Sequence, residues 1–217
     1  MTPAEYNKAL TVLLHELLAD TGFSKKRIGR LRRKAQECEQ SFTFYFTRER
    51  GLPGNQYLLT FTLSFCFSEV DQLVCQFLGQ KYDPGFGTGA LPLYCMIPDG
   101  SSLQYEYCDD GTDGAKNSLG EFAERVSEDF HAYALSFYDK YNILPKLAAY
   151  FDESKRDYYF HEVRSGKPPG SGFGCLRAAV LCLLEEWVAL DTFLEETDLL
   201  TEEQKQRITD YVEECVC

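Results

Sequence analysis

The sequence has little histidine, the side chain that most often serves as a general acid or base in enzymes. It contains only three histidines among 217 residues. No C-x-x-C pair occurs, and no histidine stands in an H-E-x-x-H or H-x-E arrangement, so the common zinc hydrolase and deaminase signatures are excluded. No apolar run reaches the roughly 18 residues that a membrane-spanning helix needs. We therefore expect no catalytic residue, metal, cofactor or membrane association.

The remaining catalytic candidates also have simple structural interpretations. His15, His131 and His161 are interpreted as surface or helix-flank histidines rather than as general bases. The glycines of Gly85–Gly89 lack the G-x-G-x-x-G spacing of a dinucleotide site, and Gly166-Lys167 precedes proline where a phosphate-binding loop needs serine or threonine. A site assembled from residues scattered along the sequence stays open as an alternative.

The cysteines predict a reducing compartment. There are nine, an odd number, and the first residues show neither the basic start nor the apolar stretch of a secretion signal. Unpaired thiols fit these two observations better than disulfides. We therefore expect a cytoplasmic protein with free cysteines.

Alternating apolar residues predict the strands. Segments 42–47 and 57–67 alternate between apolar and polar side chains, the period of a strand that buries one face. With the turn at 51–55 they predict an antiparallel hairpin. A second hairpin is predicted from 91–97 and 103–107. The buried face of the longest strand should consist of Tyr57, Leu59, Phe61, Leu63, Phe65 and Phe67.

Apolar residues at helical spacing predict helices in the rest of the chain. Thr2-Pro3-Ala4-Glu5 is a capping box for a first helix, and another helix begins at Ser68. After the last strand, the helices are expected from Ser118, after a restart at Pro145, over 152–163, over 175–194 and from Thr201.

The expected fold class is therefore α+β. It comprises an N-terminal helix, an antiparallel sheet of about four strands with an inserted helix, and a helical C-terminal half packed on it. We expect a single domain over 1–217, which could be subdivided into a helix-plus-sheet part at 1–110 and a helical part at 115–217.

Charge is strongly segregated along the chain, whose net charge is −12. Ten residues from Lys25 to Lys34 carry seven cations and no anion. One interpretation is structural: an edge strand or loop whose cations discourage sheet-to-sheet pairing and pair internally with the acidic helices. The other is binding of phosphate, nucleic acid or an acidic protein. The candidate anion-binding residues are Lys25, Lys26, Arg30, Arg32 and Arg33.

The opposite charge gathers near the C-terminus. Between Glu185 and Glu214, eleven carboxylates face only Lys205 and Arg207, a net charge of −9. Such a segment is either a solvated helix surface or a docking surface for a basic partner. The candidate partner-binding residues are Glu185, Glu186, Glu195, Glu196, Glu202 and Glu203.

The N-terminal third resembles a known kind of domain. A leucine-rich helix, the turn Gly22-Phe23-Ser24-Lys25-Lys26 and the alternating strand Thr60–Phe65 resemble an uncharacterised group of bacterial cytoplasmic α+β domains. That group is similar in character to the immunity proteins that neutralise toxins of rival bacteria. The resemblance covers residues 5–67 and implies no catalytic residue.

Together these observations favour a non-enzymatic interaction protein. The first hypothesis is an acidic immunity-type protein that neutralises a basic toxin, with acidic helices that steer association. The first alternative is a nucleic-acid or phosphate binder that uses Lys25–Lys34, although the overall negative charge disfavours it. The second alternative is an enzyme. The partner's identity and the oligomeric state are left open.

Overall fold

The computed structural model describes residues 1–47, 56–82, 88–97, 105–108, 118–153 and 171–216. The chain divides into two compact units. The sheet unit comprises Met1–Ala35, Glu39–Ser64 and Leu91–Asp139, and the helical unit comprises Gln36–Cys38, Phe65–Ala90 and Lys140–Cys217. Folding of the whole chain as a single domain stays a prediction.

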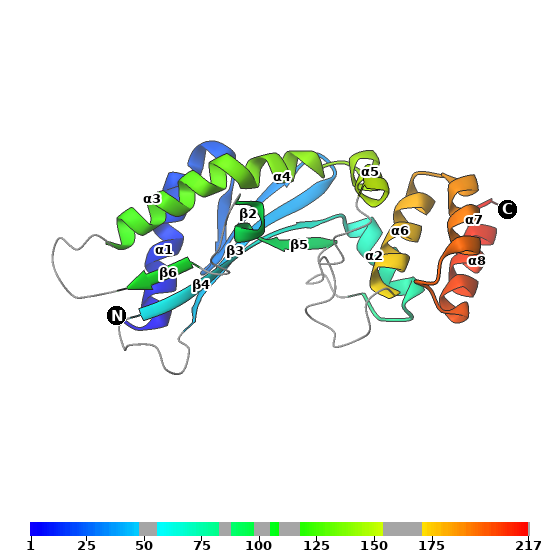
Figure 1. The fold of residues 1–217 in the computed structure, drawn as a ribbon, viewed down its shortest axis with the longest axis horizontal. Helices are drawn as coiled ribbons and strands as arrows, with labels where there is room; N and C mark the ends of the chain where they lie inside the picture. The colour runs from blue at the N-terminus through cyan, green and yellow to red at the C-terminus, as the bar shows by residue number, and fades with distance from the viewer. Residues whose placement is uncertain (48–55, 83–87, 98–104, 109–117, 154–170, 217) are drawn as a thin grey trace. The chain divides into compact units, whose positions relative to one another are not determined.

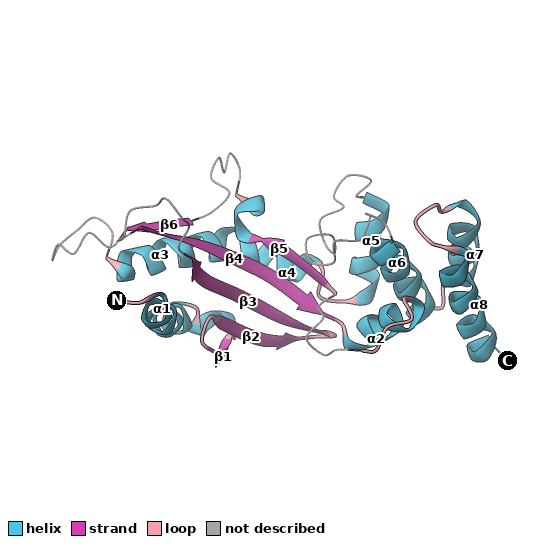
Figure 2. Cartoon of the chain, turned by 90° about the horizontal axis from the view of Figure 1, so that it is seen from below, coloured by secondary structure: helices cyan, strands magenta, loops and turns pink. Residues whose placement is uncertain are grey.

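The sheet contains six strands, two more than expected. They are β1 (Ser24–Arg27), β2 (Arg30–Ala35), β3 (Cys38–Thr47), β4 (Gln56–Cys66), β5 (Gly89–Pro92) and β6 (Tyr105–Cys108). The sheet is antiparallel with the order β1-β2-β3-β4-β5, and β6 also pairs with β4 (Figure 2). The two additional strands are β1 and β2, which form from the basic segment.

The helices of the sheet unit cover one face of the sheet. They are α1 (Pro3–Leu17), α3 (Leu119–Asp129) and α4 (Leu135–Lys140), with a π-helical turn over Phe130–Ala134 between the last two. In Figure 2, α3 and α4 lie behind the sheet. The capping boxes at Thr2 and Ser118 begin α1 and α3 as predicted.

An aromatic core lies between these helices and the sheet. Tyr6 of α1 packs against Tyr57 with a ring-centroid distance of 5.0 Å, and Phe130 packs against Phe42 at 4.8 Å. Along β4, buried and half-buried residues alternate without a break, which confirms the predicted period. All six residues of its predicted buried face are at most 5% exposed. On β3, Thr43, Tyr45 and Thr47 point to the opposite face.

The second predicted hairpin is wrong. β6 pairs antiparallel with β4, from Gln56 opposite Cys108 to Leu59 opposite Tyr105. β5 is also a neighbour of β4, and a 3₁₀ turn over Leu93–Met96 follows it directly. β4 is eleven residues long, so one of its edges can hold two short strands in succession. The turn expected at 98–100 lies outside the described residues.

The helical unit contains α2 (Ser68–Phe77), α5 (Leu144–Glu153), α6 (Ser171–Leu183), α7 (Trp187–Glu196) and α8 (Glu202–Val216). The start of α2, the helical restart at Pro145 and the capping box of Thr201 with Gln204 are confirmed. Most of the helix predicted over 152–163 lies outside the described residues.

The single helix predicted over 175–194 is wrong, because the chain breaks into α6 and α7 at Glu185. Glu185 has φ 57, in the left-handed region. Its N–H donates to the Cys182 carbonyl, and the next N–H donates to Leu181. This is the Schellman arrangement, which satisfies the last carbonyls of a helix and stops it. Apolar spacing continues through the break, so the periodicity did not reveal it.

The fold class is α+β, as the sequence predicted. The N-terminal helix, the antiparallel sheet, the inserted α2 and the helical C-terminal part are all present (Figure 1). No helix within the described ranges is both long and apolar enough to cross a bilayer.

Candidate functional site

Every carboxylate between Glu185 and Glu214 lies on the surface. We define the acidic region as these eleven residues, all of which are exposed: Glu185, Glu186, Asp191, Glu195, Glu196, Asp198, Glu202, Glu203, Asp210, Glu213 and Glu214. The two cations in the same stretch are already engaged. Lys205 lies 3.8 Å from Glu202, and Arg207 pairs with Glu203. The negative charge of the acidic region is therefore only weakly compensated within it.

The six predicted partner-binding glutamates occupy three helix ends. Glu185 and Glu186 form the break between α6 and α7, Glu195 and Glu196 end α7, and Glu202 and Glu203 begin α8. Carboxylates at the start of α8 complement the helix dipole, whereas those at the end of α7 oppose it. Glu195 and Glu196 therefore bring no benefit to helix stability.

Two apolar residues accompany these charges at the start of α7. Val188 is 82% exposed, and Trp187, the only tryptophan of the chain, is half-buried. Trp is among the residues most often found to dominate binding energy at interfaces. The region thus combines charge with a potential apolar contact.

The basic segment forms a hairpin at one edge of the sheet. β1 pairs antiparallel with β2, and β1 is the strand at one end of the sheet order. Lys25, Lys26 and Arg27 on β1 are exposed. The structure therefore contains the edge strand that the structural interpretation expected.

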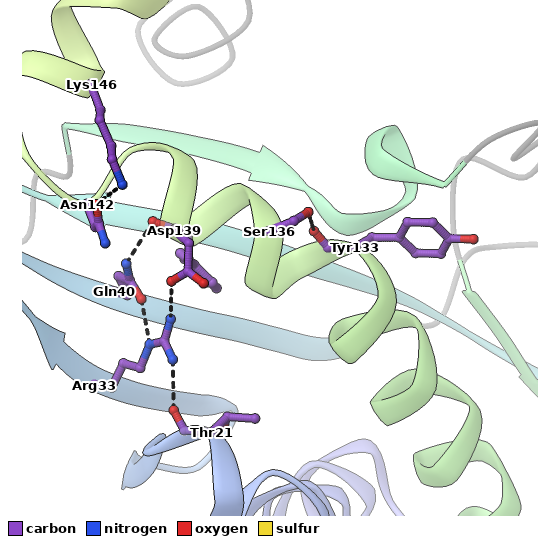
Figure 3. Close-up of polar contacts among 9 residues, drawn as sticks. Thr21, Arg33, Gln40, Tyr133, Ser136, Asp139, Asn142 and Lys146 are labelled. Carbon is purple, nitrogen blue, oxygen red and sulfur yellow. Dashed lines mark hydrogen bonds and ion pairs between the residues drawn. The ribbon is translucent and has the colours of Figure 1, made fainter.

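Arg33 of β2 is held inside the sheet unit, as Figure 3 shows. Its Nε donates to Gln40 Oε1 at 2.6 Å, Nη1 donates to the Thr21 carbonyl at 2.8 Å, and Nη2 lies 3.4 Å from Asp139. The guanidinium also lies 5.0 Å from the ring centroid of Phe23. All three of its nitrogens have partners, so Arg33 has little capacity for an external anion.

The other two arginines also contact residues of the sheet. Arg32 pairs with Glu39 at 3.0 Å, and Arg30 donates to Ser41 Oγ at 3.1 Å. The five predicted anion-binding residues are therefore not one cluster. Lys25 and Lys26 face solvent, while the three arginines bond to neighbouring residues of the protein. Among the described residues, Arg32 forms its ion pair with Glu39 and Arg33 with Asp139.

A buried polar cluster at the start of α2 was missed by the sequence analysis. Asp71 is 1% exposed and accepts hydrogen bonds from Thr88 Oγ1 at 2.7 Å and Cys66 Sγ at 3.0 Å. Thr88 Oγ1 also accepts from the Phe67 N–H at 2.7 Å. Burial raises the pKa of Asp71 to about 6, and the hydrogen bonds from Cys66 and Thr88 offset only part of that rise. In the sequence, the one sign of this cluster is that Asp71 stands among the apolar residues of a predicted helix.

The described cysteine and histidine side chains lie in several places in the structure. All seven cysteines with described side chains are free thiols. His131 bonds to the Ser127 carbonyl through Nδ1 at 2.8 Å, and His15 lies half-buried in the last turn of α1. His161 lies outside the described residues. Within the described part of the chain, no group of three or more His, Cys, Asp or Glu could hold a metal ion.

Comparison of the chain with known proteins found no family model, no curated protein and no solved structure that matches.

Proposed function

We propose that this protein is a non-enzymatic interaction module that binds a basic protein through the acidic region. The observation that carries the proposal is the exposure of all eleven carboxylates around α7 and α8, with only two cations among them. Such a surface accelerates the encounter with a positively charged partner and repels a negatively charged one. In the immunity-type form of the proposal, the partner is a basic toxin whose active surface is covered.

Contact energy in this complex comes from the start of α7. Charge steers an encounter, whereas a few apolar or aromatic side chains supply most of the binding energy. Trp187 and Val188 are adjacent to Glu186, and Val188 is 82% exposed. The large buried aromatic residues of the sheet unit belong to its core and are not available for this purpose.

The test is affinity purification from the host cell with identification by mass spectrometry, carried out in parallel with charge variants. The main variant is Glu195→Lys with Glu196→Lys. Both side chains are exposed at the end of α7, where lysine suits the helix dipole, so folding is preserved. We expect a basic partner to be captured by the wild type. Its association with the variant should be slower and less dependent on salt.

The matched control is Glu124→Lys with Glu128→Lys, which changes the net charge equally on the exposed surface of α3. This control should retain most of the association rate. A captured partner that binds both variants like the wild type would contradict the proposal. An acidic partner, or binding that fails only when Lys25 and Lys26 are neutralised, would contradict it as well.

A nucleic-acid or phosphate ligand at the basic segment is a less favoured proposal. Exposed Lys25, Lys26 and Arg27 are the observation in its favour. The engagement of Arg33 with Gln40, Thr21 and Asp139 weighs against it, because clustered free cations are what phosphate affinity needs.

A further inference from the structure

A set of hydrogen bonds fixes the turn of the basic hairpin against α1 and β3. Thr11 Oγ1 accepts from the Gly29 N–H at 2.8 Å, and the Gly29 carbonyl accepts from the Phe44 N–H at 2.9 Å. Two residues further along β3, the Phe46 N–H donates to Asn7 Oδ1 of α1 at 3.1 Å. Three segments far apart in the sequence therefore meet at Gly29.

The sequence neighbours of the three residues that meet at Gly29 include exposed apolar residues. Ile28 precedes Gly29 and is 53% exposed, Tyr45 follows Phe44 and is 50% exposed, and Val12 follows Thr11 and is 41% exposed. These are three of the six large apolar residues found exposed among the described residues. Isolated exposed apolar residues are normal on protein surfaces, whereas several at one place indicate an interaction site.

Cations flank the same turn. Lys25, Lys26 and Arg27 occupy β1 immediately before Ile28, and all three are exposed. We define the hairpin patch as Val12, Ile28 and Tyr45 together with these three cations. An apolar centre with a charged rim is the usual anatomy of a protein–protein interface.

We propose that the hairpin patch is a second interaction surface, which binds an acidic polypeptide segment carrying apolar side chains. Ile28 and Tyr45 supply the apolar contact, and the cations of β1 pair with carboxylates of the partner. The two units of the chain would thus recognise partners of opposite charge. This proposal is independent of the one for the acidic region, because all of its residues belong to the sheet unit.

Protection of the sheet edge explains only part of these observations. Lysine and arginine on an edge strand discourage pairing with other strands. That role does not require an exposed isoleucine at the turn or an exposed tyrosine on β3. The apolar residues thus indicate a contact rather than only the avoidance of one.

The composition of the patch also favours a polypeptide over a nucleic acid. Aliphatic Ile28 and Val12 offer no stacking surface for bases, and Tyr45 is the only exposed aromatic residue found among the described residues. Single-stranded nucleic acids bind through several stacked bases and a cationic groove. A net charge of −12 additionally repels a polyanion, whereas a short acidic segment carries far less charge.

Backbone contacts constrain the turn that carries Ile28. Gly29 has φ 73, and a Cβ added there would lie 2.5 Å from the Phe44 carbonyl oxygen. The close approach of the two strands fixes the position of the preceding Ile28. A preorganised apolar residue loses less conformational freedom on binding than one in a mobile loop.

The experiment is selection of binders from a library of short random displayed peptides against the whole protein. The hairpin patch should enrich peptides that combine Asp or Glu with large apolar residues. Synthetic fluorescent copies of those peptides should bind about tenfold more weakly to Ile28→Ser, and to Lys26→Glu with Arg27→Glu, than to the wild type. Because Ile28 is exposed, thermal unfolding of these variants should match the wild type.

Matched controls separate a local effect from a general one. Lys34→Glu reverses an exposed cation at the far end of β2, and Val188→Ser removes an exposed apolar residue from the acidic region. Both should bind the same peptides within about twofold of the wild type. Basic peptides enriched in the same selection would bind the acidic region. The proposal for the hairpin patch and the proposal for the acidic region can therefore be refuted independently.

Three outcomes would overturn the proposal. The first is a selection that yields no acidic, apolar peptide. The second is peptide binding that is insensitive to Ile28→Ser. The third is binding of a single-stranded oligothymidine that is tighter than peptide binding and is lost with Lys26→Glu and Arg27→Glu, which would assign the patch to nucleic acid.

Discussion

Asp71 is a carboxyl group in an environment that favours its neutral form. It is buried beside Thr88 and Cys66, and burial raises its pKa from 3.8 to about 6. A raised pKa in the folded state means that folding favours the protonated acid. Its contribution to stability is therefore fully present below about pH 4 and is lost as the pH rises through 6.

We expect Asp71→Asn to remove this pH dependence. A shift from 3.8 to about 6 corresponds to up to about 3 kcal/mol, since one pKa unit equals about 1.4 kcal/mol. Between pH 4 and 8 the wild type should lose roughly that much stability relative to the variant, as measured by urea unfolding. The free energy of unfolding of the wild type minus that of the variant should therefore change with pH. If this difference stays constant over the range, Asp71 does not titrate as described.

Gly29 is a position that only glycine can occupy without strain. Alanine there would combine φ 73 with a contact of 2.5 Å to a backbone oxygen, so we expect Gly29→Ala to cost about 2 kcal/mol or more. Gly22 is the matched control, because its φ is 77 but a Cβ added there meets nothing within 4 Å. Gly22→Ala should cost only about 1 kcal/mol in the same urea unfolding experiment. Equal losses would mean that the close approach to β3 contributes nothing.

At the scale of the element, β4 depends on one buried face. Phe61 is 1% exposed and stacks with Phe42 at a centroid distance of 5.5 Å. We expect Phe61→Ala to cost about 3–5 kcal/mol, the usual range for truncation of a buried phenylalanine. Tyr45→Ala, at a residue of β3 that is 50% exposed, should cost less than about 1 kcal/mol. A small loss at Phe61 in chemical denaturation would refute the assigned face.

The break between α6 and α7 is an element boundary set by one backbone conformation. Because Glu185 has φ 57, we expect Glu185→Gly to raise stability by about 0.5–1 kcal/mol, after the extra freedom of glycine in the unfolded chain is taken into account. Glu186 has φ −83, so Glu186→Gly should not stabilise and serves as the control. Thermal unfolding of the two variants provides the comparison. A gain at both positions would point to charge rather than to conformation.

At the scale of the whole molecule, the cysteines provide a test of compartment and of packing. Thiol titration of the denatured protein under non-reducing conditions should find nearly all of the nine cysteines free. In the native protein, exposed Cys215 should react before the other six cysteines whose side chains the structure describes. Cys175 and Cys182 should be protected, because burial raises the pKa of each thiol to about 12. Three or more disulfides in protein from the cytoplasm would contradict the expected compartment.

The segregation of charge is also a property of the whole molecule. The hairpin patch belongs to the sheet unit and the acidic region to the helical unit. If both proposals hold, the protein recognises two partners of opposite charge. Each complex should weaken with salt, and each should respond to reversal of its own cluster.

Sequence alone determined the features that depend on local rules. Alternation identified β3 and β4 with the correct buried face, and capping boxes placed the starts of α1, α3 and α8. Exposure of the acidic region was also predictable, since carboxylates are almost never buried without partners. These signals lie within a few residues of each other, so each can be read from a short window of sequence.

Only the tertiary structure decided which charges are free. Arg33 looks like its neighbours in the sequence, but its partners Gln40, Thr21 and Asp139 are brought to it by another strand, a turn and a helix. The same holds for the meeting of Thr11, Gly29 and Phe44, whose neighbours Ile28 and Tyr45 are exposed. Such contacts depend on the packing of distant segments, and no local periodicity encodes which residue a side chain will meet there.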